Sequence, residues 1–397
     1  MAQSIIVLCE DRQASLDELV CLTNNIRLAR ITDQTLALHR ISCRVPDHGG
    51  SSIPILASLL QKLRKGGELH IVSLLELARR KLATEPVDKT YGVLSLLGES
   101  LQKNIKVDYG ETAKKEFWRL YIEVGVLLLS EYGPSMLDIG ISKTRCQELP
   151  SWCPGFRSPA SVNPRGQIWL AGLADEDDDI SQVPELMVRE PGSKLLGFRG
   201  LEMDTVAAVV PLEQRAIFNM EANTVAASLL VEREAACEKL ARSVYKSLEL
   251  TPIQHIYTLI RGMSAHADIY DTSQATADYE IATKWYRALS DPAQLNVQLQ
   301  GEELLSAQRY KSAMSVAWEG TCYFSTQYGR VHLGPAGMLP GDLVCIFFGA
   351  HVPHILRLNS GQDWHELIGP AFVCGLMSGT PFYARDPVRT YQTFTLG

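Results

Sequence analysis

Apolar residues recur at helical spacing over the first third of the chain. They lie three or four positions apart in the segments 54–65, 68–82 and 111–132. Glycine-containing pairs follow the first and third segments, which is typical of helix ends because glycine accepts a left-handed backbone. The pattern predicts a mainly helical N-terminal region over residues 1–149, with one short buried strand at residues 5–8.

The pattern changes after this region. Residues 195–211 are rich in valine and leucine, and residues from 323 onward form short apolar runs separated by glycine and proline. Both patterns predict strands. Helical spacing returns between them in four segments: 231–250, 254–263, 275–289 and 302–314.

Strand patterns on either side of a helical block predict one interrupted domain. We expect an α+β protein whose β domain, residues 150–397, consists of 150–211 and 315–397 and is interrupted by a helical insertion at 212–314. Segment 195–211 should join the strands after residue 320 in a mainly antiparallel barrel or sandwich. The helical N-terminal region and the insertion should pack on this β structure. Trp152 stands between two prolines at the entry to the β domain and is predicted to be buried.

Composition and charge exclude some classes of function. Hydrophobic residues make up 46% of the 397 residues and charged residues 21%, as in ordinary globular proteins. The net charge of −7 gives no support for nucleic-acid binding, which needs a clustered basic surface. No apolar run is long enough to span a membrane, and the first ten residues lack the basic region of a signal peptide. Nine scattered cysteines without a CxxC pair favour the reducing cytoplasm.

Motifs for metal or cofactor chemistry are weak. His351 and His354 flank Pro353, but a metal site needs further ligands such as His332, His365 or Cys345. We interpret the pair as a hairpin turn with two exposed imidazoles and expect no metal. The sequence has no GxSxG, GxGxxG or Walker motif, so we also expect no nucleotide and no other cofactor.

Five separated segments carry a family resemblance: ATEPVDKTYGVL at 83–94, VDY at 107–109, LPSWCP at 149–154, GDLV at 341–344 with Leu356-Arg357, and LIGPAFVCGLMSG at 367–379. In this order they resemble the region that follows the HET domain in fungal heterokaryon-incompatibility proteins. Glu85, Val87, Ser95 and Thr380 depart from the residues usual in the family. Val7-Leu8-Cys9 resembles the strand that closes the HET domain, so we expect the chain to lack that domain itself.

The physical chemistry of these segments indicates a scaffold. Gly341-Asp342 before a strand is a turn signal, since glycine accepts positive φ and aspartate bonds to nearby amides. Gly375 and Gly379 are predicted to flank a buried strand. Asp88 stands where it can cap the free amides of a helix.

Two hypotheses for the function remain open. The resemblance implies a cofactor-independent cyclase or pericyclase, similar to stand-alone HET-like proteins of fungal metabolite pathways, acting on a hydrophobic terpenoid or polyene by Diels–Alder cycloaddition. The alternative is a non-enzymatic regulatory module of an incompatibility system, which binds a partner protein through its helical layer. The sequence leaves both the substrate and the oligomeric state open.

The cyclase hypothesis needs an apolar pocket where the helical layer meets the β domain. We assign its wall to four aromatic side chains, and a donor that polarises the dienophile to three polar ones. The wall residues are Tyr91, Trp118, Trp364 and Phe372, and the donors are Arg330, His332 and Arg357. These three polar groups have a second interpretation, in which they pair with Asp342, Asp363 or Glu366.

Overall fold

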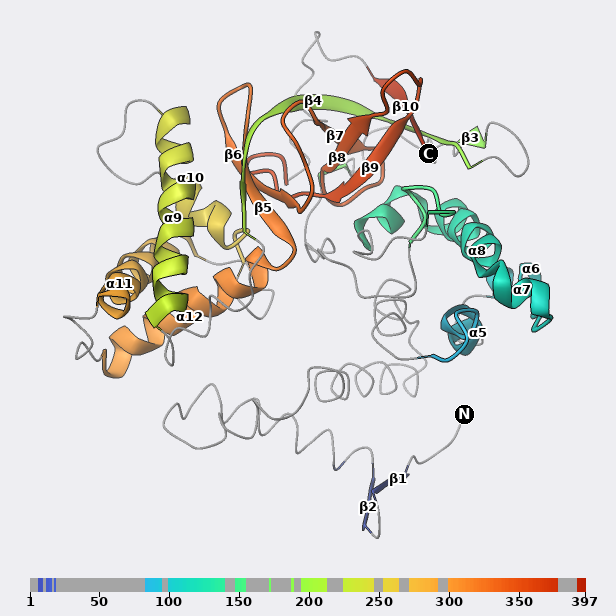
Figure 1. Ribbon diagram of the computed structural model, residues 1–397, viewed down its shortest axis with the longest axis horizontal. Helices are drawn as coiled ribbons and strands as arrows, with labels where there is room; N and C mark the ends of the chain where they lie inside the picture. Colours follow the sequence, from blue (N-terminus) through green and yellow to red (C-terminus); the bar gives the residue numbers. More distant parts are fainter. Residues whose placement is uncertain are drawn as a thin grey trace, which may run out of the picture. The chain divides into compact units, whose positions relative to one another are not determined.

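The computed structural model describes 6–9, 12–15, 18, 83–94, 99–139, 147–154, 171–172, 187–188, 194–212, 224–245, 253–263, 271–291, 299–377 and 391–397 (Figure 1). Two compact units divide the chain. The first comprises Met1–Phe117 with Phe156–Pro159, and the second comprises Trp118–Gly155 with Ala160–Gly397. The helices predicted at 54–65 and 68–82 lie outside the described residues. The domain boundary proposed after residue 149 stays a prediction.

The first unit contains a hairpin and short helices. Its elements are β1 (Ile6–Cys9), β2 (Arg12–Ser15), α5 (Asp88–Leu94), α6 (Glu99–Asn104) and α7 (Glu111–Lys115). β1 and β2 pair antiparallel, so the strand predicted at residues 5–8 is present as β1.

The helix predicted over 111–132 is interrupted. α7 ends before Glu116, whose N–H still bonds to the Thr112 carbonyl, and α8 (Phe117–Tyr132) begins directly after it. A 3₁₀ segment, η1 (Gly133–Ile139), follows, and Gly133 takes the positive φ of 68° that ends α8.

The second unit is built on a mostly antiparallel sheet. Its strands are β3 (Met187–Val188), β4 (Leu196–Pro211), β5 (Thr321–Thr326), β6 (Val331–Pro335), β7 (Leu343–Phe347), β8 (His354–Leu358), β9 (His365–Pro370) and β10 (Gln392–Leu396). Seven follow the order β10-β9-β8-β7-β4-β5-β6, and β3 pairs β4 beside this path. β10 also pairs β4, so β4, β7, β8, β9 and β10 close into a ring. The pairing of β10 with β9 is parallel.

Strand β4 belongs to both halves of this sheet. Its first half pairs β10 and β7, and its second half pairs β5. Register shifts between Glu202 and Asp204 and between Val206 and Ala208 mark bulges, which bend a strand and increase its twist. The prediction that 195–211 joins the strands after residue 320 is confirmed, as is the α+β class with a C-terminal antiparallel barrel.

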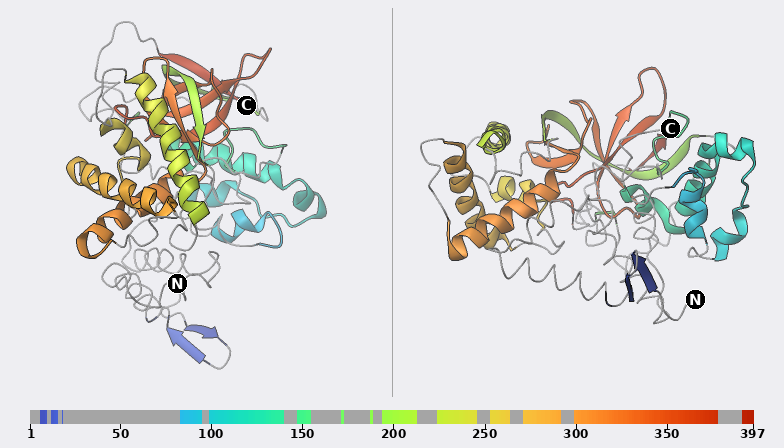
Figure 2. Two further views of the ribbon diagram at one scale, coloured as in Figure 1. Left: turned by 60° about the vertical axis from the view of Figure 1, so that its left-hand side comes forward. Right: turned by 60° about the horizontal axis from the view of Figure 1, so that its bottom comes forward.

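Four helices form the insertion: α9 (Thr224–Val244), α10 (Ile253–Leu259), α11 (Thr272–Ser290) and α12 (Gly301–Trp318). They correspond to the four predicted helical segments. Asp271 caps α11 by accepting a hydrogen bond from the Gln274 amide at 3.0 Å. Figures 1 and 2 show these helices gathered beside β5 and β6.

Two hydrophobic cores result. One fills the barrel and includes Leu201, Val344 and Ile355. The other lies between the insertion and the barrel, where Leu230 and Met314 from the helices share a cluster with Val331, Leu333 and Phe372. The insertion is therefore joined to the barrel by a continuous buried seam.

One predicted strand is wrong. Residues 371–377 form turns after β9, and a single bridge joins Phe372 to Leu333 of β6. Gly375 has a φ of +85°, which explains why glycine stands in this turn. Gly379 lies outside the described residues.

Candidate functional site

The LPSWCP segment ties several elements of the second unit together. Trp152 is 2% exposed, as predicted, and its indole N–H donates to the Lys194 carbonyl at 2.8 Å, just before β4. The Ser151 hydroxyl donates to the Gly397 carbonyl and accepts from the Leu367 amide of β9 at 2.8 Å. We call Ser151 and Trp152 the clasp.

A glycine on α8 fits the clasp. A Cβ at Gly125 would lie 3.2 Å from the Trp152 ring and 3.4 Å from the Cys153 sulfur. The Cys153 thiol donates to the Tyr121 carbonyl of the same helix at 3.3 Å. The segment therefore anchors α8 as well as the strands, and its groups serve architecture.

The Gly-Asp and Leu-Arg pairs are one structural unit. Gly341 adopts a φ of +94°, and Asp342 Oδ2 accepts from the Leu339 amide at 2.7 Å. The Arg357 guanidinium donates from Nε and Nη2 to the two Asp342 oxygens, both at 2.8 Å. Nη2 also donates to the Gly337 carbonyl at 2.8 Å. The hydrogen bonds to Asp342 raise the pKa of Arg357.

This geometry bears on the role predicted for Arg357. Asp342 is 3% exposed, whereas the Arg357 side chain is 30% exposed. Two of its three guanidinium nitrogens thus bind the start of β7, as the alternative pairing with Asp342 predicted. The donor role stays a prediction.

In the first unit, two segments of the resemblance bind each other. The Tyr91 and Tyr109 rings lie 5.3 Å apart, and the Tyr91 hydroxyl accepts from the Asp108 amide at 3.1 Å. The Tyr109 hydroxyl donates to Asp88 Oδ1 at 2.7 Å, and this bond raises the pKa of Tyr109. Asp88 thus accepts a hydrogen bond from the hydroxyl of Tyr109, and Tyr91 joins α5 to the loop before α7.

Three predicted site residues come together around β6. The amide of Cys374 donates to His332 Nδ1 at 3.1 Å, and Phe372 exchanges two backbone hydrogen bonds with Leu333. Arg330 lies against Gly375, where a Cβ would be 3.4 Å from its Nη1. His332 is 1% exposed, and burial, with a smaller contribution from Arg330, lowers its pKa to about 3. The imidazole is therefore neutral at physiological pH and uses Nδ1 as an acceptor.

The remaining predicted wall residues lie elsewhere. Trp364 precedes β9, and its ring lies against Gly397. Trp118 begins the second unit, with Arg119 5.2 Å and Lys194 5.1 Å from its ring centre. Tyr91 belongs to the other compact unit.

The expectation for the histidine pair needs a correction. His354 is fully buried on β8 with its ring 5.3 Å from that of Phe347, so it is not an exposed imidazole of a turn. The reason is that His354 begins β8, whose first three residues are all buried. Within the described ranges, no group of three or more His, Cys, Asp or Glu side chains is placed to hold a metal ion.

A buried polar network at the seam was missed by sequence reasoning. The Tyr279 hydroxyl of α11 donates to Glu234 Oε1 of α9. His255 of α10 has its Nε2 3.8 Å from the same oxygen and its Nδ1 2.8 Å from the Tyr323 hydroxyl of β5. We call these four residues the Glu234 network. No sequence motif indicates this network, because its four residues are scattered along the sequence.

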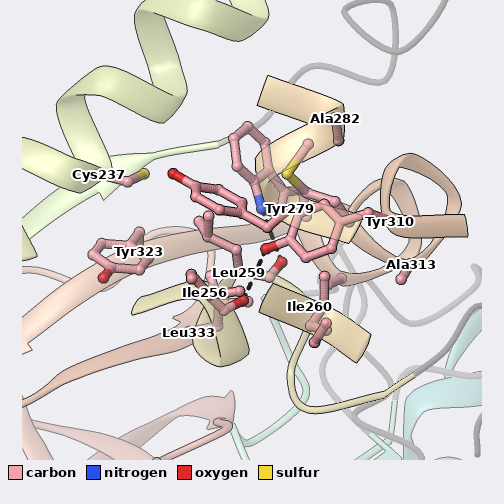
Figure 3. Close-up of a cluster of buried hydrophobic side chains, with 14 of the residues drawn as sticks. Cys237, Ile256, Leu259, Ile260, Tyr279, Ala282, Tyr310, Ala313, Tyr323 and Leu333 are labelled. Carbon is pink, nitrogen blue, oxygen red and sulfur yellow. Dashed lines mark hydrogen bonds between the residues drawn. The ribbon is translucent and has the colours of Figure 1, made fainter. Parts of the chain in front are cut away.

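The Glu234 network lies within apolar surroundings. Figure 3 shows Tyr279 and Tyr323 among Ile256 and Leu259, with the Tyr279 ring directed toward the helix that carries Cys237. Glu234 is 3% exposed, and His255 and Tyr323 are fully buried. Burial opposes ionisation of Glu234, but the nearby His255 imidazole and the hydrogen bond from Tyr279 outweigh it and lower the pKa of this carboxyl.

Such a set of groups has two chemical uses. A carboxylate, an imidazole and two phenols in contact can share protons, as in acid–base catalysis. They can also fix the relative position of the elements that carry them. Because all four side chains are buried, the second use fits the geometry.

No helix within the described part of the chain is long and apolar enough to cross a bilayer.

Comparisons with known proteins agree with this architecture. Residues 254–384, which contain α10 to α12 and β5 to β9, match the Het-6 beta-barrel domain family. The chain is 23% identical over 346 residues to Heterokaryon incompatibility protein 6, OR allele, from Neurospora crassa. That alignment covers 75% of this chain and 49% of the relative, so the chain spans about half the length of the curated protein it matches. No solved structure shows a significant match.

Proposed function

We propose that this chain is a non-enzymatic regulatory module, related to heterokaryon incompatibility proteins, that acts by binding a partner protein. The proposal rests on the contacts that side chains of the family-like segments make within the protein. The clasp, the Asp342–Arg357 pair and the Tyr91–Tyr109 pair are all engaged within the protein. Segments of this kind specify a scaffold, and a scaffold acts through its surface.

Several apolar side chains on the surface suit such a role. Exposed examples on the insertion are Val225 (64%), Ile253 (45%) and Val316 (44%). Tyr328, at the tip of the β5–β6 hairpin, is 79% exposed. Tyrosine is enriched where proteins bind each other, because its ring is large and loses little conformational entropy.

The competing hypothesis is the cofactor-independent cyclase. It assigns the polarising donor to Arg330, His332 or Arg357 and the apolar wall to Tyr91, Trp118, Trp364 and Phe372. The Arg357 guanidinium already donates to both oxygens of Asp342, and His332 is 1% exposed. A donor engaged elsewhere stabilises a developing charge less well, which is why we rank this hypothesis second.

The regulatory role is testable by expression in Neurospora crassa. Strains with and without this chain are paired, and the growth and viability of the resulting heterokaryons are measured. We expect the full chain to change heterokaryon viability and the Tyr328→Asp variant, altered at a side chain that is 79% exposed, to do so less. The Trp152→Ala variant, whose fold is weakened, controls for dependence on folded protein. Unchanged viability at matched protein levels would contradict the proposal.

The cyclase hypothesis has its own assay. The purified chain is incubated, without metal or cofactor, with a linear polyene that carries a diene and a dienophile. We expect the cycloadduct to form at the rate and with the stereochemistry found in buffer. Acceleration that is lost in Arg330→Met or Arg357→Met would establish the enzyme and overturn the regulatory proposal.

A further inference from the structure

The Glu234 network takes one polar side chain from each of four elements. Glu234 comes from α9, His255 from α10, Tyr279 from α11 and Tyr323 from β5. Three of these elements belong to the insertion and the fourth belongs to the barrel. The network therefore crosses the seam between them.

A network of this kind holds elements differently from an apolar contact. Apolar side chains tolerate small shifts, whereas a buried carboxylate needs its donors at hydrogen-bond distance. Removal of one partner leaves a charge or a donor buried without compensation, which is costly in a medium of low dielectric constant. The position of α9 thus depends on Tyr279, which donates to Glu234, and on His255, which lies 3.8 Å from the same oxygen and contacts Tyr323 of β5.

The barrel has means of holding itself together that the insertion does not share. Its strands close into a ring around their own core. The clasp and the Asp342–Arg357 pair also bind barrel strands. Loss of the Glu234 network leaves all of these contacts in place.

We propose that the Glu234 network is a latch, which keeps α9, α10 and α11 docked on the barrel and, when broken, releases these helices while the barrel stays folded. This device goes beyond the proposed function and does not depend on any partner. It gives the chain two states that differ in the surface of the insertion.

Acid is one way to break the latch. Around the network lie Arg287 on α11, which favours the Glu234 charge, and Cys237 on α9, whose thiol is buried. Glu238, on α9, raises the pKa of Tyr279. Because the pKa of Glu234 is lowered in the folded protein, its contribution is present above the ordinary value of 4.5 and is lost as the pH falls through the folded value.

Hydrogen exchange of the full chain, resolved by peptide, tests the latch. Glu234→Gln keeps the shape of the side chain and removes its charge. Glu232→Gln is the matched control, because Glu232 lies on the same helix and its side chain is exposed. We expect amides of α9, α10 and α11 to exchange at least about tenfold faster in Glu234→Gln, a factor equivalent to ~1.4 kcal/mol. Amides of β7 and β8, and all amides of the control, should keep the wild-type rates.

Two results would overturn the proposal. Unchanged exchange in α9–α11 would mean that the network does not hold the helices. Equal acceleration in the helices and the barrel would mean that both unfold as one unit. If Glu234→Gln fails to fold, hydrogen exchange of the wild-type chain at decreasing pH tests the proposal instead. On acidification from pH 7 to pH 3, protection corrected for the intrinsic rate should fall first in α9–α11 below about pH 4.5, and a simultaneous fall in β7 and β8 refutes the latch.

Discussion

The barrel and the insertion each contain a buried carboxylate, and the two regions compensate its charge in different ways. In the barrel, Asp342 binds one arginine only 15 positions away on a neighbouring strand, and that arginine reaches the surface. In the insertion, Glu234 binds Tyr279, 45 positions away, and lies near His255, which reaches Tyr323 over another 68 positions. The first arrangement is local and partly solvated, whereas the second is long-range and fully enclosed. The comparison teaches that a buried carboxylate is recognisable in the sequence when it lies in a short turn pair such as Gly341-Asp342, whereas the four residues of the Glu234 network are scattered and leave no motif.

The largest loss of stability is expected for a substitution in the clasp. Trp152→Ala should lower the free energy of unfolding by about 3–5 kcal/mol, because a buried indole and its bond to Lys194 are lost. Chemical denaturation measures this loss. Trp118→Ala, at a partly exposed ring, should cost clearly less. Equal losses would show that burial of Trp152 does not govern its contribution.

The Asp342–Arg357 pair should respond asymmetrically. Arg357→Met leaves a carboxylate that is 3% exposed without its main partner, so we expect a loss of about 2–4 kcal/mol. Asp342→Asn leaves a partly exposed guanidinium and a neutral amide, so we expect about 1–3 kcal/mol. Urea titrations of both variants measure the difference. A larger loss in Asp342→Asn would contradict the view that the buried partner dominates.

His332, in the seam, makes the stability of the protein depend on pH. Its pKa is lowered from 6.5 to about 3 in the folded protein, so the unfolded chain takes up a proton that the folded chain refuses between these values. Stability should therefore fall as the pH decreases through this window, by about 1.4 kcal/mol per pH unit from this group. Denaturation midpoints measured from pH 7 to pH 4 give the slope.

A matched variant isolates that effect. His332→Asn keeps an acceptor for the Cys374 amide and does not titrate. We expect the slope between pH 6.5 and pH 4 to become smaller in this variant. An unchanged slope would assign the acid sensitivity in this range to groups other than His332.

The smallest effect belongs to the edge of the Glu234 network. Tyr323→Phe removes the hydroxyl 2.8 Å from His255 Nδ1 and keeps the buried ring, so we expect a loss of about 1 kcal/mol. Thermal unfolding measures it against Tyr328→Phe, at the exposed hairpin tip, which should be neutral. A neutral Tyr323→Phe would mean that the barrel contributes only apolar contacts to the seam.

The sequence predicted the fold where local patterns suffice. Periodicity located α9 to α12, and valine-rich texture identified β4 and its partners after residue 320. The sequence patterns gave the wrong prediction where contacts with distant residues determine the local structure. Glu116 interrupts a continuous apolar pattern, and the turn after β9 has the composition of a strand. His354 has the spacing of a turn pair, yet it begins β8, whose first three residues are all buried.

The candidate site was harder to predict for a physical reason. Arg330, His332 and Phe372 meet because β6 pairs with the turn after β9, and spacing in the sequence does not encode that pairing. Glu234 and His255 stand in ordinary helical contexts, where a charged residue usually faces solvent. Packing of α9 against α11 and β5, and of α10 against α11 and β6, turns them inward.

Strand β4 also constrains when this protein folds during synthesis. Its residues leave the ribosome before β5, β7 and β10 exist, yet its backbone groups pair with all three. A nascent chain that carries β4 alone exposes sixteen residues of strand-forming sequence without a partner. Barrel closure must therefore wait until translation reaches the C-terminal strands.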